Sequence, residues 1–121
     1  MLKANIDDLE RFVTKDGSTV VEIAGPSWTP ARNQSLAEAV VPPGGETAEH
    51  YHPETEELYY FTAGAGRMRL GQAEAAVRVG DCVVIPPETV HKLWNPGPEP
   101  LVLLCCCAPA YSDDDTVMTG R

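Results

Sequence analysis

The sequence predicts an all-β domain, a sandwich or barrel of short antiparallel strands, and two observations carry this prediction. Glycine and proline recur from residue 44 onward at intervals of about 7 to 11 residues, the spacing expected of turns between short strands. The runs between these turns are apolar or alternating, and no window of helical length and period separates them. A parallel arrangement of alternating strands and helices is therefore disfavoured.

The first strands can be placed in order along the chain. Residues 18–24 are rich in β-branched types and predict a strand, after a polar lead in which residues 7–12 form one helical turn. Residues 26–34 carry two prolines and predict an irregular connection. Residues 35–41 have helical propensity, but the run is too short for a helix before residues 42–45 (PPGG) stop it, and we predict a strand.

The later strands follow the regular turns. Residues 109–121 are polar and predict a solvated C-terminal extension or a short capping turn. We therefore predict a single domain over residues 1–121, with a barrel core at about 18–108. The further predicted strands are residues 58–63, 67–70, 76–79, 82–85, 91–94 and 101–107.

Charge and hydropathy exclude two classes of partner. The chain has 18 acidic and 9 basic residues and a formal net charge of -9, which repels phosphate backbones, so no nucleic-acid partner is expected. No run approaches the roughly 18 apolar residues of a membrane span, and the first residues lack the apolar core of a signal peptide. We expect no membrane partner and a cytoplasmic protein.

The four cysteines are Cys82 and the run Cys105-Cys106-Cys107. This spacing neither builds a disulfide framework nor matches paired zinc-binding CxxC motifs. We expect buried, reduced thiols that fill a core strand. On a strand, Cys105 and Cys107 point to one face and Cys106 points to the other, so the run offers at most two thiols to one site.

The chain has three histidines, and two of them, His50 and His52, share one face of a strand because they lie two residues apart. Glu57 has the opposite parity and cannot join them on an unbroken strand. Pro53 breaks the strand, and we expect a hairpin to bring Glu57 back beside the pair.

The third histidine, His91, follows about 40 residues later, where a barrel can place it opposite the first two. A lone histidine more often has a structural or surface role than a metal-binding one. Three imidazoles and one carboxylate, however, form a borderline donor set. Such a set suits Mn, Fe, Co, Ni, Cu or Zn, and much less Ca or Mg, which prefer oxygen.

These residues resemble the two conserved motifs of the cupin superfamily. The first motif asks for Gly, five residues, His-x-His, three or four residues, Glu, six residues and Gly. The second asks for Gly, five residues, Pro-x-Gly, two residues, His, three residues and Asn. Nine of the ten specified positions agree, and Glu88 replaces a motif glycine. The matching residues are Gly44, His50, His52, Glu57 and Gly64 in the first motif, and Gly80, Pro86, His91 and Asn95 in the second.

The resemblance implies a double-stranded β-helix, a jelly-roll-like barrel, over roughly two-thirds of the chain. It also implies that the four metal-binding positions of the family fall on His50, His52, Glu57 and His91, with one divalent transition metal per chain. Glu88 touches no ligand, but it puts the turn conformation in question, because glycine takes a positive φ more easily than glutamate. A different turn is the alternative.

Similar proteins leave one or two metal positions to water, where substrate or O₂ binds. The resemblance therefore implies a metal-dependent enzyme on a small oxygen-bearing organic molecule, of dioxygenase, isomerase or decarboxylase type. The alternatives are a non-catalytic module that binds or senses a small ligand, and a purely structural metal. No nucleophile lies beside a base, so covalent catalysis is disfavoured.

A substrate pocket would need aromatic walls and polar groups near the motifs. Tyr59 and Phe61 share the strand face of Glu57. Arg67 and Arg69 share one face of their strand, and alternation favours a solvated face for them. Small barrels of this family commonly pair by exchanging N-terminal strands, so the resemblance also implies a homodimer. The candidate pocket residues are Tyr59, Phe61, Glu46 and Trp94.

Overall fold

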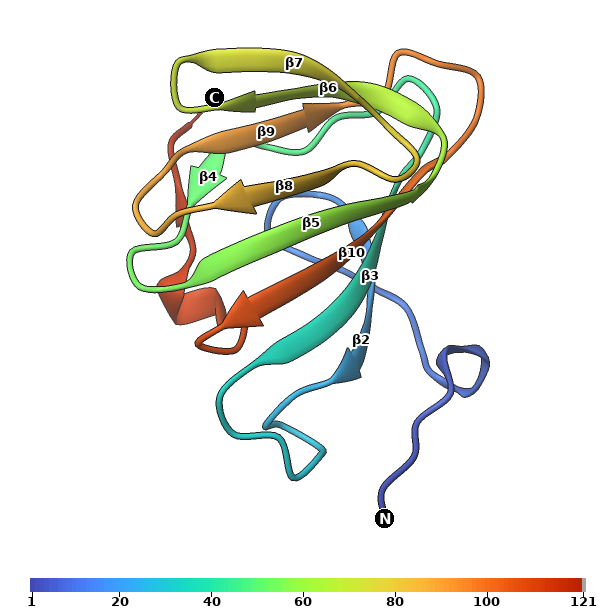
Figure 1. Ribbon diagram of the computed structural model, residues 1–121, viewed down its shortest axis with the longest axis vertical. Helices are drawn as coiled ribbons and strands as arrows, with labels where there is room; N and C mark the ends of the chain where they lie inside the picture. The colour runs from blue at the N-terminus through green and yellow to red at the C-terminus, as the bar shows by residue number, and fades with distance from the viewer. Residues whose placement is uncertain (121) are drawn as a thin grey trace.

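The computed structural model describes residues 1–120 and consists of two antiparallel β-sheets that face each other (Figure 1). The six-stranded sheet has the order β1-β2-β3-β10-β5-β8, and the five-stranded sheet has the order β11-β4-β9-β6-β7. The predicted all-β double-stranded β-helix is confirmed. The strands are β1 (Phe12–Val13), β2 (Thr19–Ala24), β3 (Ser35–Val41), β4 (His50–Tyr51), β5 (Glu56–Ala63), β6 (Ala65–Leu70), β7 (Ala73–Arg78), β8 (Cys82–Ile85), β9 (His91–Trp94), β10 (Leu101–Ala108) and β11 (Val117–Met118), with 3-10 turns η1 (Ile6–Asp8) and η2 (Asp113–Asp115).

Strand β5 shows how the sequence pattern builds the larger sheet. Its residues alternate strictly between exposed and buried from Glu56 to Thr62, so that Glu57, Tyr59 and Phe61 face the interior. The pleat of a strand dictates this alternation. Strand β10 lies between β5 and β3 and pairs with both along nearly its whole length, which makes it the central strand of this wall.

The apolar core fills the space between the two sheets. Phe61 is fully buried in the larger sheet, and it lies in one cluster with residues of both walls. Burial of this apolar surface is the main favourable term in folding. The buried members of the cluster are Ala39, Val41, Tyr59, Phe61, Met68, Val77, Ile85, Leu93, Leu101 and Leu103.

Most predicted strands are present at nearly the predicted bounds, including the short strand at Ser35–Val41. The prediction that a hairpin joins His52 to Glu57 is wrong. β4 belongs to the five-stranded sheet and β5 to the six-stranded sheet, so the chain crosses between the sheets at Pro53. Glu57 therefore approaches the two histidines from the opposite wall.

Residues 109–120 contain the short turn that was one of the two predicted alternatives, followed by a strand that was not predicted. The segment turns through η2 and then forms β11, which adds to the edge of the smaller sheet by pairing with β4. Thr116 is buried between these elements. Two residues are too short a strand to be read from hydrophobic alternation, and the acidic run hides the turn.

Glu88 keeps the left-handed turn that a glycine would favour, with φ of 67°. Its amide donates to the carbonyl of His52 at 2.8 Å, so this turn anchors the segment that carries a histidine. A glutamate with positive φ is strained by roughly 1 kcal/mol, since Cβ crowds the following carbonyl.

The described residues hold no helix that is long and apolar enough to cross a membrane.

Candidate metal centre

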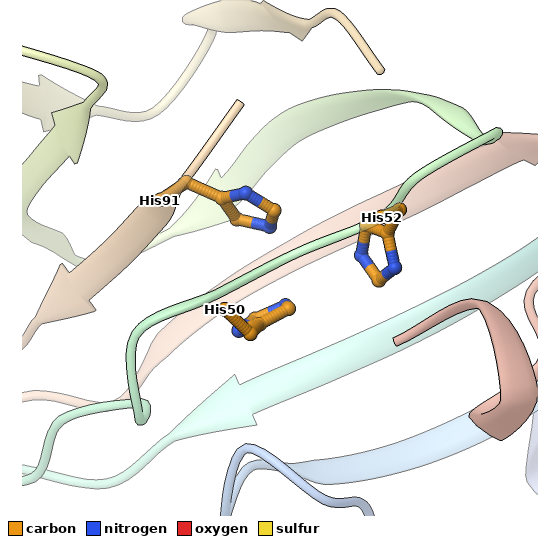
Figure 2. Close-up of side chains that lie close together, drawn as sticks. All are labelled: His50, His52 and His91. Atoms are coloured by element: carbon orange, nitrogen blue, oxygen red, sulfur yellow. The ribbon is translucent and has the colours of Figure 1, made fainter. Parts of the chain in front are cut away.

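Two neighbouring strands of the smaller sheet position the three histidines. His50 on β4 lies directly opposite His91 on β9, and cross-strand partners project to the same face of a sheet. His52 follows two residues after His50 and points the same way. All three side chains are buried, and their rings converge (Figure 2).

Each imidazole is oriented through its Nδ1 atom. His50 Nδ1 lies 2.9 Å from the carbonyl oxygen of Ala48, and His91 Nδ1 lies 3.0 Å from that of Thr89. His52 Nδ1 lies 3.0 Å from the carbonyl oxygen of Asp115. A carbonyl can only accept a hydrogen bond, so each Nδ1 carries the proton and each Nε2 keeps a free lone pair.

The ring nitrogens are close enough to share one ion. One nitrogen from each histidine lies within 4.8 Å of the nitrogens of the other two. Two donor atoms that each bind an ion at about 2.1 Å lie at most about 4.2 Å apart. A small rotation of the rings would therefore bring the three nitrogens within bonding distance of one ion.

Glu57 reaches this cluster from the larger sheet. Its Oε1 atom lies 3.2 Å from His52 Nε2 and 3.7 Å from His91 Nε2. Its other oxygen, Oε2, accepts a hydrogen bond from the Cys107 thiol at 3.2 Å. Cys107 is directly opposite Glu57 in the pairing of β5 with β10, which explains the contact.

Burial and neighbouring charges shift the pKa values in this cluster. Burial, aided by the neighbouring His50, lowers the pKa of His91 from 6.5 to about 4, so this imidazole is neutral near pH 7. Burial also acts to lower the pKa of His52, but the adjacent Glu57 carboxylate, 3.2 Å from Nε2, and Asp115 outweigh it, and the net shift is upward. Burial together with the Glu57 charge raises the pKa of the Cys107 thiol, which stays protonated and can donate.

Two buried polar atoms of the cluster lack a hydrogen-bond partner, Glu57 Oε1 and His91 Nε2. Unsatisfied buried polar atoms are costly and rare, and each calls for an explanation. Both atoms are electron-pair donors aimed at the same point. A divalent cation there would satisfy both, so the residues present fit a metal.

His50, His52 and Glu57 line an open cavity of the barrel, whereas His91 is not among its lining residues. Tyr59 lines the cavity, as expected, and burial raises the pKa of its hydroxyl well above the ordinary value. Cys105 and Cys107 line it as well, whereas Cys106 faces the other side of the sheet, as the pleat predicts.

The other predicted pocket residues lie elsewhere. Phe61 is part of the apolar core. Glu46 is exposed and pairs with Lys92 at 3.4 Å, and Trp94 lies beneath the side chains of Arg69 and Lys92. The assignment of Glu46 and Trp94 to the pocket is corrected, because neither residue lines the cavity; Glu46 lies outside the strands and meets Trp94 through an isolated bridge.

The outward assignment of the two arginines agrees with the structure. Arg67 pairs with Glu74 at 3.0 Å on the surface, and Arg69 pairs with Glu49. Cys82 is exposed, against the expectation that all four cysteines are buried, because it begins the edge strand β8.

Three residues near the site were missed by the sequence interpretation. Asp16 lines the cavity, and its Oδ2 atom lies 4.0 Å from His50 Nε2. The ring centroid of Tyr111 lies 6.1 Å from that of His52, and Asp115 orients His52 through its carbonyl. These residues come from segments flanking the barrel, and no periodic pattern points to them.

Comparisons with known proteins agree with this architecture. The family model described as "Cupin domain" matches residues 37–107. An uncharacterised protein of Methanocaldococcus jannaschii is 43% identical over 116 residues, which cover 96% of this chain and 93% of that protein.

Two solved structures extend the comparison. A variant of Streptomyces Pac13 with uridine superposes with a TM-score of 0.80 at 18% identity, covering 98% of this chain and 91% of that one. An oxalate decarboxylase of Lactobacillus farciminis in complex with formate has a TM-score of 0.78 at 28% identity, covering 93% of this chain but 34% of that one. The match to the family model spans more than half of the sequence, and the chain therefore belongs to the cupin family.

Proposed function

We propose that this protein is an enzyme that depends on one divalent transition metal and acts on a small, oxygen-bearing organic molecule. The convergence of three oriented imidazoles with an unsatisfied carboxylate oxygen carries this proposal. Three of the four donors, His50, His52 and Glu57, line an open cavity, which a closed structural site would not require.

His50, His52, His91 and Glu57 are the residues that would hold the metal. Their three nitrogens and one carboxylate suit Mn, Fe, Co, Ni, Cu or Zn. Such an ion, when bound, polarises a coordinated oxygen atom of a substrate or lowers the pKa of coordinated water. The chain itself fixes the tautomer of each imidazole and keeps Glu57 Oε1 aimed at the cluster.

The related proteins support a small-molecule substrate. One structural neighbour is described as a nucleoside dehydratase, and its variants were solved with uridine. Another is an oxalate decarboxylase, of whose length this chain spans about a third. Dehydration and decarboxylation both act on molecules whose oxygen atoms can bind a metal, and this shared chemistry is what we carry over to the present site.

Metal content tests the proposal directly. Protein purified without chelators should contain close to one transition metal per chain by inductively coupled plasma spectrometry, and His52→Ala should lose most of it. Glu74→Gln, a surface change on β7, is the matched control and should keep the metal. A wild-type chain that binds none of the six metals would contradict the proposal.

Solvent access to the metal separates an enzyme from a structural site. In protein loaded with Mn²⁺, we expect enhanced relaxation of water protons, because at least one coordination position exchanges with solvent. Relaxation no greater than that of buried, fully ligated Mn²⁺ would show a structural metal. A metal with exchangeable water that turns over none of the nucleoside, hydroxy-acid or diketone candidates would favour a binding module.

We also propose that the protein is a homodimer. Strand β1 is the outermost strand of the larger sheet, and its two residues, Phe12 and Val13, are exposed. An exposed sheet edge is a template for pairing with another chain. Light scattering during size-exclusion chromatography at micromolar concentration should give twice the chain mass, and Val13→Pro should lower it. A monomer mass for the wild type would overturn the dimer.

A further inference from the structure

The carboxylate of Asp16 is held rigidly on the cavity wall, in the turn between β1 and β2. Its Oδ1 atom accepts three hydrogen bonds, from Thr14 Oγ1 at 2.7 Å, Ser18 N at 2.9 Å and Ser18 Oγ at 2.6 Å. The Asp16 carbonyl also accepts from the amide of Ala48 at 2.8 Å, which ties this turn to the segment leading into His50.

The second oxygen, Oδ2, points toward the histidine cluster. It lies 4.0 Å from His50 Nε2, and the Asp16 side chain is only 13% exposed. With Oδ1 fully used by the turn, Oδ2 is the atom left to accept a hydrogen bond from a ligand. A ligand bound beside the histidine cluster would therefore meet Oδ2 as a hydrogen-bond acceptor.

The charges around the cavity are negative. Asp16, Glu22 and Glu57 contribute carboxylates to its lining, and within residues 1–120 no lysine or arginine lines it. The nearby basic side chain is directed elsewhere, since Lys15 Nζ donates to the carbonyls of Asp113 and Thr116 at 2.9 and 3.1 Å. A site built for carboxylate or phosphate substrates typically supplies a basic partner.

We propose that Asp16 makes this site selective for an uncharged substrate that carries a hydroxyl group beside its metal-binding oxygen, and disfavours carboxylates. The inference rests on the proposed metal-dependent function. A divalent ion and the Glu57 carboxylate together leave one positive charge, which Asp16 balances. A carboxylate ligand would add an uncompensated negative charge near Asp16, whereas a hydroxyl group would donate to Oδ2.

Glycolamide and glycolate form a nearly isosteric pair of probes. Both have a hydroxyl next to a carbonyl-type oxygen, but only glycolate is charged. Their affinities for the Mn²⁺-loaded protein can be measured from the loss of water-proton relaxation as each displaces coordinated water. Asp16→Asn keeps an oxygen for the Thr14 and Ser18 donors while it removes the charge, and Glu74→Gln removes one charge away from the cavity.

We expect Asp16→Asn to shift the ratio of glycolate to glycolamide affinity about tenfold toward glycolate, while Glu74→Gln leaves the ratio unchanged. Mn²⁺ affinity, measured separately by titration, should stay within about threefold of wild type in both variants. An unchanged ratio in Asp16→Asn with Mn²⁺ still bound would overturn the inference and leave the metal-dependent function standing. Loss of Mn²⁺ binding in Asp16→Asn would instead assign Asp16 to the metal and also overturn it. A wild-type chain without Mn²⁺ affinity would overturn the proposed function and this inference with it.

Discussion

The interior of the barrel has two halves of opposite character. Around Phe61, Met68 and Leu101 the side chains of the two sheets interlock, and these three residues are 3% exposed or less. Around His50 and Asp16 the barrel instead leaves a cavity, whose lining combines these polar side chains with apolar ones such as Leu103. One β-sandwich therefore contains both a packed core and a hollow site.

The packed half and the histidine cluster contribute differently to stability. Among residues 1–120, the two buried side-chain polar atoms without a hydrogen-bond partner, Glu57 Oε1 and His91 Nε2, both belong to the histidine cluster and not to the packed half. Binding sites are commonly destabilising in isolation and are supported by the rest of the structure. Mutations in the two halves should therefore affect different measurements.

The largest effect is expected in the packed half. Phe61→Ala should lower the free energy of unfolding by about 3 to 5 kcal/mol, because the fully buried ring leaves a cavity in a close-packed core. Tyr60→Ala, at the adjacent exposed position, is the control and should cost less than about 1 kcal/mol. Urea unfolding measures both values, and equal losses would remove the distinction between the two faces of β5.

The second effect tests the hollow half without its metal. The pKa of His91 is about 4 in the folded protein and 6.5 ordinarily, so the unfolded chain binds a proton first as the pH falls. In the chelated protein, His91 should leave the free energy of unfolding unchanged above about pH 6.5. This free energy should fall by up to about 3 kcal/mol as the pH approaches 4.

His91→Asn is the comparison for this pH dependence. His52, whose raised pKa acts in the opposite direction, is present in both proteins, so the difference between their curves isolates His91. Urea unfolding of the chelated proteins between pH 7 and pH 4 measures it. Parallel curves for wild type and His91→Asn would contradict the burial of a neutral imidazole.

A smaller effect is expected where the two halves meet, at the Cys107 thiol. Cys107→Ala removes the donor to Glu57 Oε2 and should weaken metal binding about tenfold, since groups that orient a ligand typically contribute this much. Cys107→Ser keeps a donor and should stay within about threefold of wild type. Co²⁺ titration followed by visible absorption gives these affinities, with Cys106→Ala on the other face as the control.

The smallest effect concerns the turn at Glu88. Glu88→Gly should raise the free energy of unfolding by up to about 1 kcal/mol, because glycine adopts the observed φ of 67° without strain. Metal affinity should not change, since Glu88 meets His52 through its backbone amide. A destabilised Glu88→Gly variant would show that the glutamate side chain stabilises the turn in another way.

The sequence was sufficient to predict most of the fold and the convergence of the three histidines. Strand alternation fixes which side chains face inward, and it places Glu57, Tyr59 and Phe61 correctly on β5. The spacing of His50 and His52 predicts a shared face without any knowledge of the other strands.

The errors have a common physical origin. Alternation gives the face of a side chain only relative to its own strand, so it could not decide that Trp94 and Glu46 lie outside the cavity. It also says nothing about which sheet a strand joins after a proline, and the crossing at Pro53 was therefore taken for a hairpin. Asp16 was missed because turn residues carry no periodic signal.

The pairing of β11 with β4 has a consequence for the order of events during biosynthesis. His52 receives its orienting carbonyl from Asp115, 63 positions further along the chain, and His50 lies opposite Met118 in the same ladder. A nascent chain on the ribosome can form early strands as they emerge, but His52 acquires its orienting contact only after residues 113–118 have been translated. For the proposed metal-dependent function, loading would thus be a late step, and a ribosome stalled before residue 113 would hold a barrel that lacks the contact orienting His52.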